Sequence, residues 1–173
     1  ETAEMKALTN VLLAHPHVHV LADDIYEHIV FAPHGFCSPA GIETSLAGRT
    51  LTVNGVSKAY AMTGWRLGYT AAPKPIADAI IKIQSHSVSN ATTFAQFGGV
   101  AALEGDQGFI NDMREEYDGR RQFMLARLQA IHNVRVVEPK GAFYFFVRTG
   151  DIGLKSQNLC DKLLSRYKVA AIP

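Results

Sequence analysis

The chain has 173 residues, of which 47% are hydrophobic and 19% charged, and its formal net charge is +1 at pH 7. This length suits one domain or two small ones, and a charge so close to neutral predicts no general attraction to nucleic acid or to an anionic membrane. The longest apolar runs are much shorter than the ~20 residues that a membrane-spanning helix needs. Cys37 and Cys160 lack the spacing of a metal or redox motif, so we expect free thiols in a reducing compartment, the cytoplasm.

Hydrophobic spacing in the first part of the chain alternates between a helical period and short apolar runs. This alternation is typical of an α/β domain with a parallel sheet, in which ligands bind beyond the carboxyl ends of the strands. In chain order, the predicted elements are a helix over residues 2–15, a strand over 18–23, a loop over 31–49, strands over 50–53 and 67–71, a helix that starts at residue 76, a turn over 85–92 and a helix over 93–104.

The second part of the chain has a different pattern of predicted elements, with one long helix followed by short strands. The pattern predicts a helix over 109–131, strands over 134–137 and 143–147, a helix over 157–167 and the start of a strand at 169–172. We therefore expect a domain boundary within the long helix, with residues 1–110 in one domain and 111–173 in the other. The buried side of that helix is predicted to consist of Met113, Tyr117, Phe123, Met124 and Leu128.

The ends of the chain fall inside predicted elements. The first residues already follow a helical pattern, and the last ones form a strand-like run that ends at Pro173. We expect this chain to be a piece of a longer polypeptide.

The segment from Asn54 to Tyr69 places a single lysine, Lys58, in a loop of small residues, with Arg66 eight positions later. A lysine at the carboxyl end of a strand is partly desolvated, which disfavours the ammonium form and makes the amine a nucleophile toward a carbonyl group. A guanidinium group fits a phosphate with two parallel hydrogen bonds. Pyridoxal 5'-phosphate carries both an aldehyde, which could react with the lysine, and a phosphate, which the arginine could bind.

Asp23 and Tyr26 follow the strand predicted at 18–23 and supply the other groups that this cofactor needs. A carboxylate keeps a pyridine nitrogen protonated, and the protonated ring withdraws electrons from the reacting carbon. A phenol can donate to the ring oxygen. Taken alone, an aspartate and a tyrosine at this spacing are more often a cap and a packed ring, but together with Lys58 and Arg66 they favour a cofactor site.

The run from Gly55 to Gly68 resembles the pyridoxal-phosphate attachment motif of class I aminotransferases, and the resemblance is closest to the bacterial aspartate aminotransferase branch. The stretches at 20–28, 89–96 and 139–144 are similar to further segments of the same family, in the same order. The resemblance implies an α/β chain of pyridoxal-phosphate-dependent transferase fold type I. It would comprise part of the large parallel-sheet domain and part of the smaller C-terminal α+β domain.

The resemblance also implies roles for particular residues. Lys58 would bind the cofactor covalently as a Schiff base and shuttle the proton, while Asp23 would hold the ring nitrogen and Tyr26 the ring oxygen. Arg66, together with Ser57, would bind the phosphate. The implied reaction is a ping-pong transfer of an amino group between an aspartate-like amino acid and a 2-oxo acid, in a homodimer.

The chain departs from the family pattern in three places. Gly55 stands where many members carry a serine three residues before the lysine. The family's Asn-Pro-x-x-Pro-Thr-Gly segment would precede residue 1, and the arginine that binds the substrate α-carboxylate would follow Pro173.

A dimer contact is expected near Ser89 and Asn90.

Two other functions remain open from the sequence. One is a pyridoxal-phosphate-dependent lyase or synthase on the same fold, which would use the same lysine and aspartate. The other is an aminotransferase-like domain of a transcription regulator. The histidines at positions 15, 17 and 19 are too few and too weakly patterned to predict a metal site, so no metal is expected.

Overall fold

A computed structural model describes residues 2–173 and shows two compact units. The first unit contains the residues up to Glu115 together with Lys140–Ala142, and the second contains Glu116–Pro139 and Phe143–Pro173. The division falls within the long helix α5 (Gly108–Gln129).

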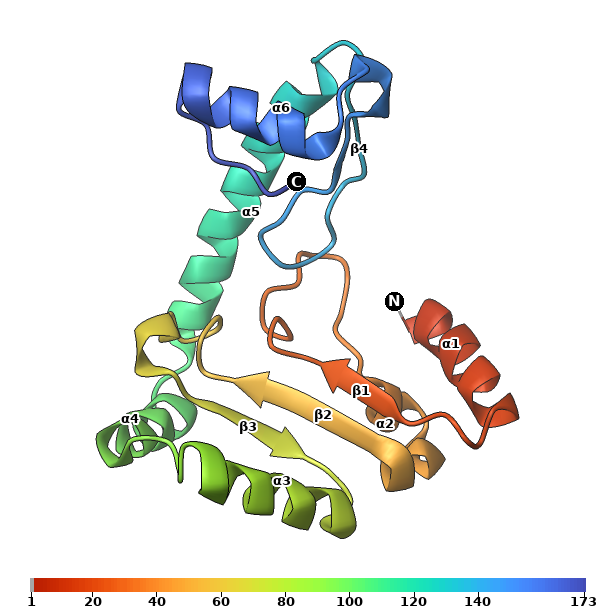
Figure 1. The fold of residues 1–173 in the computed structure, drawn as a ribbon, viewed down its shortest axis with the longest axis vertical. Coiled ribbons are helices and arrows are strands. Elements are labelled where there is room, and N and C mark those ends of the chain that lie inside the picture. Colours follow the sequence, from red (N-terminus) through yellow and green to blue (C-terminus); the bar gives the residue numbers. More distant parts are fainter. Residues whose placement is uncertain (1) are drawn as a thin grey trace. The chain divides into compact units, whose positions relative to one another are not determined.

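The first unit is built on a three-stranded sheet with the order β1-β2-β3 (Figure 1). β1 (Val20–Asp23) lies parallel to β2 (Thr50–Gly55), whereas β3 (Gly68–Ala71) lies antiparallel to β2. The parallel pair agrees with the α/β alternation of the sequence, but the alternation gave no sign that β3 runs the other way. Because β3 turns back, residues 56–67 form one long connection at the edge of the sheet where β1 and β2 end.

Arg49 fixes the end of the first helix, α1 (Thr2–Ala14), against the loop that precedes β1. Its guanidinium donates to the carbonyl of Leu12 at 2.6 Å, to that of His15 at 3.1 Å and to that of Val18. The last carbonyls of a helix have no partner within the helix, so a cation placed there satisfies them and complements the helix dipole. Arg49 itself ends the 3-10 helix η1 (Thr44–Arg49), which follows the short helix α2 (Pro39–Ile42).

The core of the first unit includes residues of the loops that follow β1 and β2. Its fully buried side chains are Ile29, Phe31, Leu46 and Val56, and they are joined by Ala22, Ala59, Ala95 and Ile110. Burying a side chain of this size contributes about 1.5–3 kcal/mol. The loops that carry the predicted site are therefore anchored by packing on both sides of Lys58.

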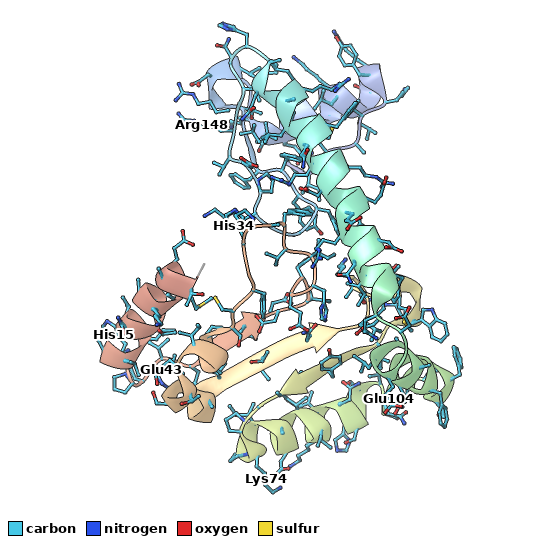
Figure 2. The ribbon with its side chains drawn as sticks, turned by 180° about the vertical axis from the view of Figure 1, so that it is seen from behind. His15, His34, Glu43, Lys74, Glu104 and Arg148 are labelled. Carbon is cyan, nitrogen blue, oxygen red and sulfur yellow. The ribbon has the colours of Figure 1, made fainter. Side chains whose placement is uncertain are left out.

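Two helices follow the sheet, α3 (Lys74–Ser87) and α4 (Thr93–Glu104). The turn predicted over 85–92 is wrong in its first part, because α3 continues to Ser87 and ends where the Val88 amide donates to the Gln84 carbonyl. α4 has the predicted bounds, and the Gly105 amide closes it by donating to the Ala101 carbonyl at 3.0 Å. Lys74 and Glu104, at the start of α3 and the end of α4, are labelled in Figure 2.

The second unit has less regular structure than the sequence predicts. Its strands β4 (Arg135–Val136) and β5 (Val147–Arg148) form a short antiparallel pair, and residues 169–172, expected to start a strand, are irregular. They have no strand partner among the described residues, and Ile172 is 89% exposed. The remaining elements are η3 (Gly150–Ile152), α6 (Ser156–Lys162) and η4 (Leu163–Tyr167).

Two residues predicted on the buried side of α5 are exposed. Phe123 is 54% exposed and Met124 is 42% exposed, whereas Met113, Tyr117 and Leu128 are half-buried. Helical spacing identifies an apolar face, but only the packing of other elements decides how much of that face is covered.

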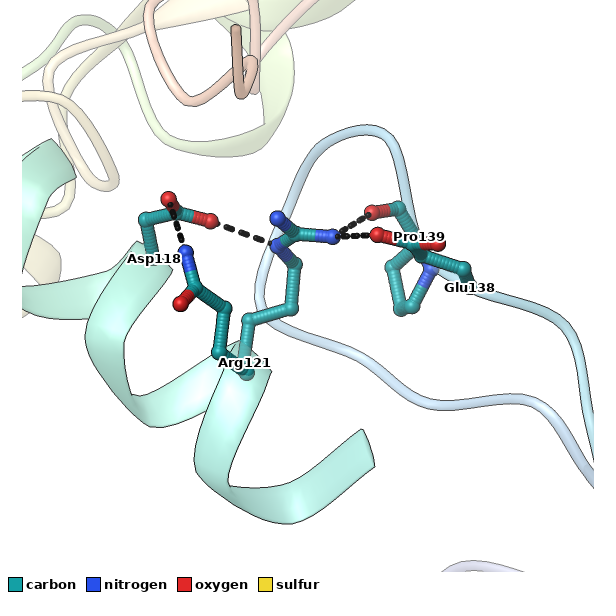
Figure 3. Close-up of polar contacts among 5 residues, drawn as sticks. Asp118, Arg121, Glu138 and Pro139 are labelled. Atoms are coloured by element: carbon teal, nitrogen blue, oxygen red, sulfur yellow. Dashed lines mark hydrogen bonds and ion pairs between the residues drawn. The ribbon is translucent and has the colours of Figure 1, made fainter. Parts of the chain in front are cut away.

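Arg121 on α5 is the centre of a polar cluster in the second unit (Figure 3). Its Nε donates to Asp118 Oδ1 at 2.6 Å, and its Nη1 donates to Glu138 Oε1 at 2.6 Å and to the Pro139 carbonyl at 3.3 Å. The side chain is only 11% exposed. This cluster fixes the loop at Glu138–Pro139 onto the helix.

Candidate functional site

Lys58 lies against the ring of Tyr26. Its Nζ is 5.7 Å from the centroid of the ring, within the range of a cation–π contact. Both residues are half-buried. The backbone around the lysine forms a helical turn, in which the Tyr60 amide donates to the Val56 carbonyl and the Ala61 amide donates to the Lys58 carbonyl, each at 3.3 Å. Two of the predicted site residues, from segments far apart in the sequence, are thus brought together.

Asp23 is the last residue of β1 and pairs in register with Val53 of β2. Its side chain is exposed, and its Oδ1 accepts from the Ile25 amide at 3.4 Å. The next residue, Asp24, continues the link between the strands, because its amide donates to the Val53 carbonyl at 2.9 Å. Asp23 therefore sits at the carboxyl edge of the parallel pair, where α/β sheets bind ligands.

The two residues expected to bind a phosphate lie near the two ends of the connection formed by residues 56–67. Ser57 is half-buried and directly precedes Lys58. Arg66 is exposed, has the left-handed backbone conformation (φ 53°) and follows the short turn η2 (Thr63–Trp65). Its Nη1 donates to the Thr63 carbonyl at 2.9 Å, a local bond that holds the side chain beside its own loop.

α4 packs against the far end of the connection 56–67, called the lysine loop below, through two glycines that the sequence analysis did not single out. A Cβ on Gly98 would come within 2.5 Å of the Trp65 ring, and a Cβ on Gly99 within 2.4 Å of Leu67 Cδ2. Trp65 and Leu67 flank Arg66. The close approach of the helix backbone therefore sets where the guanidinium-bearing part of the loop lies.

A second link that sequence reasoning missed connects the turn after β1 to the end of β2. Asn54 Nδ2 donates to Glu27 Oε1 at 2.7 Å, and Asn54 Oδ1 accepts from the Gly55 amide at 2.7 Å. Polar residues next to strand ends hint at such a contact, but their partners cannot be read from the sequence. A Cβ on Gly55 would lie 3.0 Å from the Leu67 carbonyl oxygen, so the backbone here is closely packed as well.

Negative charge gathers near the ends of β1 and β2. The pKa of the Asp24 carboxyl is raised by burial, and further by the charges of Glu27 and Asp23. The pKa of the Tyr60 phenol is raised by burial and then by Glu27, and that of Tyr69 by burial, Glu27 and Tyr60. This region therefore favours positively charged or proton-bearing groups.

A cavity of about 280 Å³ lies beside Glu27, between the turn after β1 and the start of α5. Tyr60 approaches it from the lysine loop, where its hydroxyl donates to Gln107 Oε1 at 2.9 Å. The lining residues are Glu27, His28, Val30, Phe36, Gln107, Ile110, Asn111 and Arg114.

Two histidines near the end of α1 contact each other. His15, labelled in Figure 2, and His17 stack edge to face with their ring centroids 5.9 Å apart. Across residues 2–173, no cluster of three or more histidine, cysteine, aspartate or glutamate side chains could hold a metal ion. Over the same residues, no helix combines the length and apolar character that crossing a membrane requires.

Curated relatives cover nearly all of this chain. An aspartate aminotransferase of Rhizobium meliloti is 40% identical over 181 residues, which is 99% of this chain and 44% of the relative, and one from strain 1021 is 46% identical over 183 residues. An aspartate/prephenate aminotransferase of Cereibacter sphaeroides is 46% identical over 144 residues, covering 83% of this chain and 36% of the relative. The chain thus spans less than half the length of these curated relatives.

Solved structures of aminotransferases share this fold and confirm the predicted fold class. The crystal structure of the Rhizobium meliloti aspartate aminotransferase superposes with a TM-score of 0.92 at 40% identity, over 100% of this chain and 46% of the other. An aspartate aminotransferase variant of Thermus thermophilus in complex with tryptophan superposes with a TM-score of 0.86 at 33% identity, over 99% of this chain and 44% of the other. The family profile described as aminotransferase class I and II matches residues 1–173. Since that match covers the whole chain, the chain belongs to the class I and II aminotransferase family.

Proposed function

We propose that the protein is a pyridoxal-phosphate-dependent aminotransferase, which transfers an amino group between an aspartate-like amino acid and a 2-oxo acid in a ping-pong cycle. The observation that carries this proposal is the contact of the Lys58 amine with Tyr26, in a chain of the aminotransferase family. Both residues lie in the loops that follow β1 and β2.

The chemistry of the side chains at this edge matches each functional group of pyridoxal 5'-phosphate. The Lys58 amine suits the aldehyde, the Asp23 carboxylate suits the protonated ring nitrogen, and the Tyr26 phenol suits the ring oxygen. The phosphate would be bound by the Arg66 guanidinium and the Ser57 hydroxyl. When bound, the cofactor supplies an electron-withdrawing ring that stabilises negative charge on the Cα atom of the amino acid.

In this proposal, the residues of the chain hold and move protons. The Asp23 carboxylate would keep the proton on the ring nitrogen, and the Tyr26 hydroxyl would donate a hydrogen bond to the ring oxygen. As a free amine, Lys58 Nζ takes the proton from the substrate Cα atom and later returns one.

The first test compares Lys58→Ala with Lys74→Ala in the full-length protein. Lys74 is an exposed lysine paired with Asp78 at 2.8 Å on α3, so its loss should leave cofactor binding intact. Lys58→Ala should remove both the visible absorption band of the bound cofactor and the turnover of aspartate with 2-oxoglutarate. An unchanged band and unchanged turnover in Lys58→Ala would contradict the proposal.

The preference for aspartate is proposed from the names of the relatives, two of which are aspartate aminotransferases and a third an aspartate/prephenate aminotransferase. Product analysis with aspartate and 2-oxoglutarate should yield oxaloacetate and glutamate. A lyase or synthase would instead release a product that has lost a substituent of the amino acid. The relatives favour amino-group transfer over these reactions and over a regulatory role.

We also propose that the first unit is part of a cofactor-binding domain, the second part of a smaller C-terminal domain, and the whole protein a homodimer. The segment at Ser89 and Asn90 lies between α3 and α4 and is exposed, which makes it accessible to a second subunit. Light scattering on the full-length protein should give the mass of two subunits.

A further inference from the structure

The side chain of Asn54 joins the two segments that carry the proposed site. Asn54 belongs to β2, close to the start of the lysine loop, and Glu27 directly follows Tyr26. The Asn54 amide group donates to Glu27 Oε1 and accepts from the Gly55 amide, both at 2.7 Å. One side chain is thus bound to the turn over residues 24–29 (the tyrosine turn) and to Gly55, the last residue of β2, which leads into the loop that carries Lys58.

This bond lies beyond the point where the backbone holds the two segments together. The pairing of β1 with β2 ends at Asp23 and Val53, and the Asp24 amide adds one more bond to the Val53 carbonyl at 2.9 Å. On its other edge β2 pairs with β3 from Thr52 to Gly55, with Asn54 opposite Tyr69, whereas no strand pairing with β1 continues past Val53. Beyond Asp24, the side chains of Glu27 and Asn54 therefore connect the tyrosine turn to the lysine loop.

The Glu27 end of this bridge is held in place. Glu27 lies in a turn closed by its own amide, which donates to the Asp24 carbonyl at 2.9 Å, and by the Ile29 amide, which donates to the Tyr26 carbonyl at 2.9 Å. Ile29 is fully buried. The Glu27 side chain is 30% exposed, so its bond to Asn54 is partly shielded from competing water. The same oxygen, Oε1, also lies 3.4 Å from His28 Nε2, the titratable group that faces it on its own turn.

We propose that Glu27 is a positioning residue of the site, which acts through Asn54 to hold the Lys58 amine against Tyr26. This inference rests on the proposed function, since its consequence is tighter binding of pyridoxal 5'-phosphate. Glu27 does not itself need to touch the cofactor. What it supplies is a fixed acceptor oxygen for the Asn54 amide.

The test measures cofactor affinity and the pH midpoint of the cofactor absorption band in the full-length protein, for E27A, N54A, E27Q and the double variant E27A/N54A. E27A and N54A should each weaken binding of pyridoxal 5'-phosphate about tenfold, the loss expected for one hydrogen bond. They should also shift the pH midpoint of the band in the same direction. E27Q keeps an acceptor oxygen and should bind within about twofold of the parent.

The double variant shows whether Glu27 and Asn54 act together or affect cofactor binding independently. If Glu27 acts through Asn54, E27A/N54A should bind no more weakly than either single variant. Glu104→Ala is the matched control, since Glu104 is an exposed carboxylate at the end of α4 (Figure 2), and it should leave affinity and midpoint unchanged. Thermal unfolding of each variant checks that it is folded. If E27A does not fold, the comparison of N54A with E27Q still tests the inference.

Three results would overturn the inference. They are parent-like affinity in both E27A and N54A, additive losses in the double variant, and a loss in E27Q as large as that in E27A. A parent protein that binds no pyridoxal 5'-phosphate would instead overturn the proposed function. The two failures are thus separable in one experiment.

Discussion

Asp24 is a half-buried carboxylate with two other carboxylates near it in the chain. Burial, followed by the charges of Glu27 and Asp23, raises its pKa, which means that the folded chain holds this proton more tightly than the unfolded chain does. A raised pKa favours folding below the ordinary pKa of an aspartate, and that contribution is lost as the pH rises through the folded-state pKa. At neutral pH the ionised Asp24 therefore opposes folding.

Asp24→Asn should accordingly raise the melting temperature at pH 7, because the amide carries no charge to desolvate. The difference from the parent should shrink as the pH falls below the ordinary pKa of the carboxyl. Asp78→Asn, at an exposed carboxylate paired with Lys74, is the control and should show no such gain. A lower melting temperature for Asp24→Asn than for the parent at pH 7 would refute the assignment.

The role proposed for Asp23 is in the reaction and not in attachment of the cofactor. Asp23→Ala should keep the visible band of the bound cofactor but lower the transamination rate by about 10²–10³-fold, the usual cost of removing one preorganised electrostatic group. Stopped-flow spectra and steady-state rates check the two parts separately. An unchanged rate would exclude the role proposed for Asp23.

At the scale of elements, the glycines of α4 set the position of the loop that carries Arg66. Gly98→Ala places a Cβ 2.5 Å from the Trp65 ring, so the ring and the loop must shift. Overpacking of this kind costs about 1–3 kcal/mol. We expect lower affinity for pyridoxal 5'-phosphate in this variant, measured by titration.

Gly119→Ala on α5 is the control, because nothing lies within 4 Å of a Cβ at that position. In an open helical position, alanine should raise stability by about 0.5–1 kcal/mol relative to glycine. Gly98→Ala should show less gain than this, or a loss. Equal thermal stabilisation by both substitutions, with unchanged cofactor affinity, would show that α4 does not constrain the loop.

The neighbouring arginines of α5 allow a second comparison between elements. Arg121 is 11% exposed and bridges Asp118 to the loop at Glu138, whereas Arg120 is 68% exposed and pairs only locally with Glu116 at 2.8 Å. Arg121→Ala should cost about 1–3 kcal/mol, because it removes a largely buried side chain together with its bonds to Asp118, Glu138 and the Pro139 carbonyl. Arg120→Ala should cost less than about 0.5 kcal/mol. Urea unfolding of the two variants side by side checks this order.

At the scale of the whole molecule, the buried side chains all lie in the first unit, and none of the described residues of the second unit is classed as buried. The second unit is held by half-buried contacts and by the polar cluster at Arg121. Hydrogen exchange should therefore be slowest around Ile29, Leu46 and Val56 and faster throughout residues 143–173. Equal protection in both units would contradict this distribution.

The parts of the site that could be predicted are those encoded in short stretches of sequence. Lys58 with Arg66, and Asp23 with Tyr26, could be proposed as site residues because each pair follows a predicted strand, in a short stretch that resembles the family. The Glu27–Asn54 bridge and the packing of Gly98 against Trp65 could not, since they join segments far apart in the chain. The antiparallel direction of β3 was missed for a related reason, because apolar runs do not indicate strand direction.

The central claim is that Lys58 is the attachment point of pyridoxal 5'-phosphate, and peptide mapping tests it most directly. The full-length protein is incubated with the cofactor, the lysine–cofactor bond is made permanent with borohydride, and the digested peptides are analysed by mass spectrometry. We predict the phosphopyridoxyl group on the peptide that contains Lys58. An unmodified Lys58, with the label on another lysine such as Lys74 or on none, would contradict the claim.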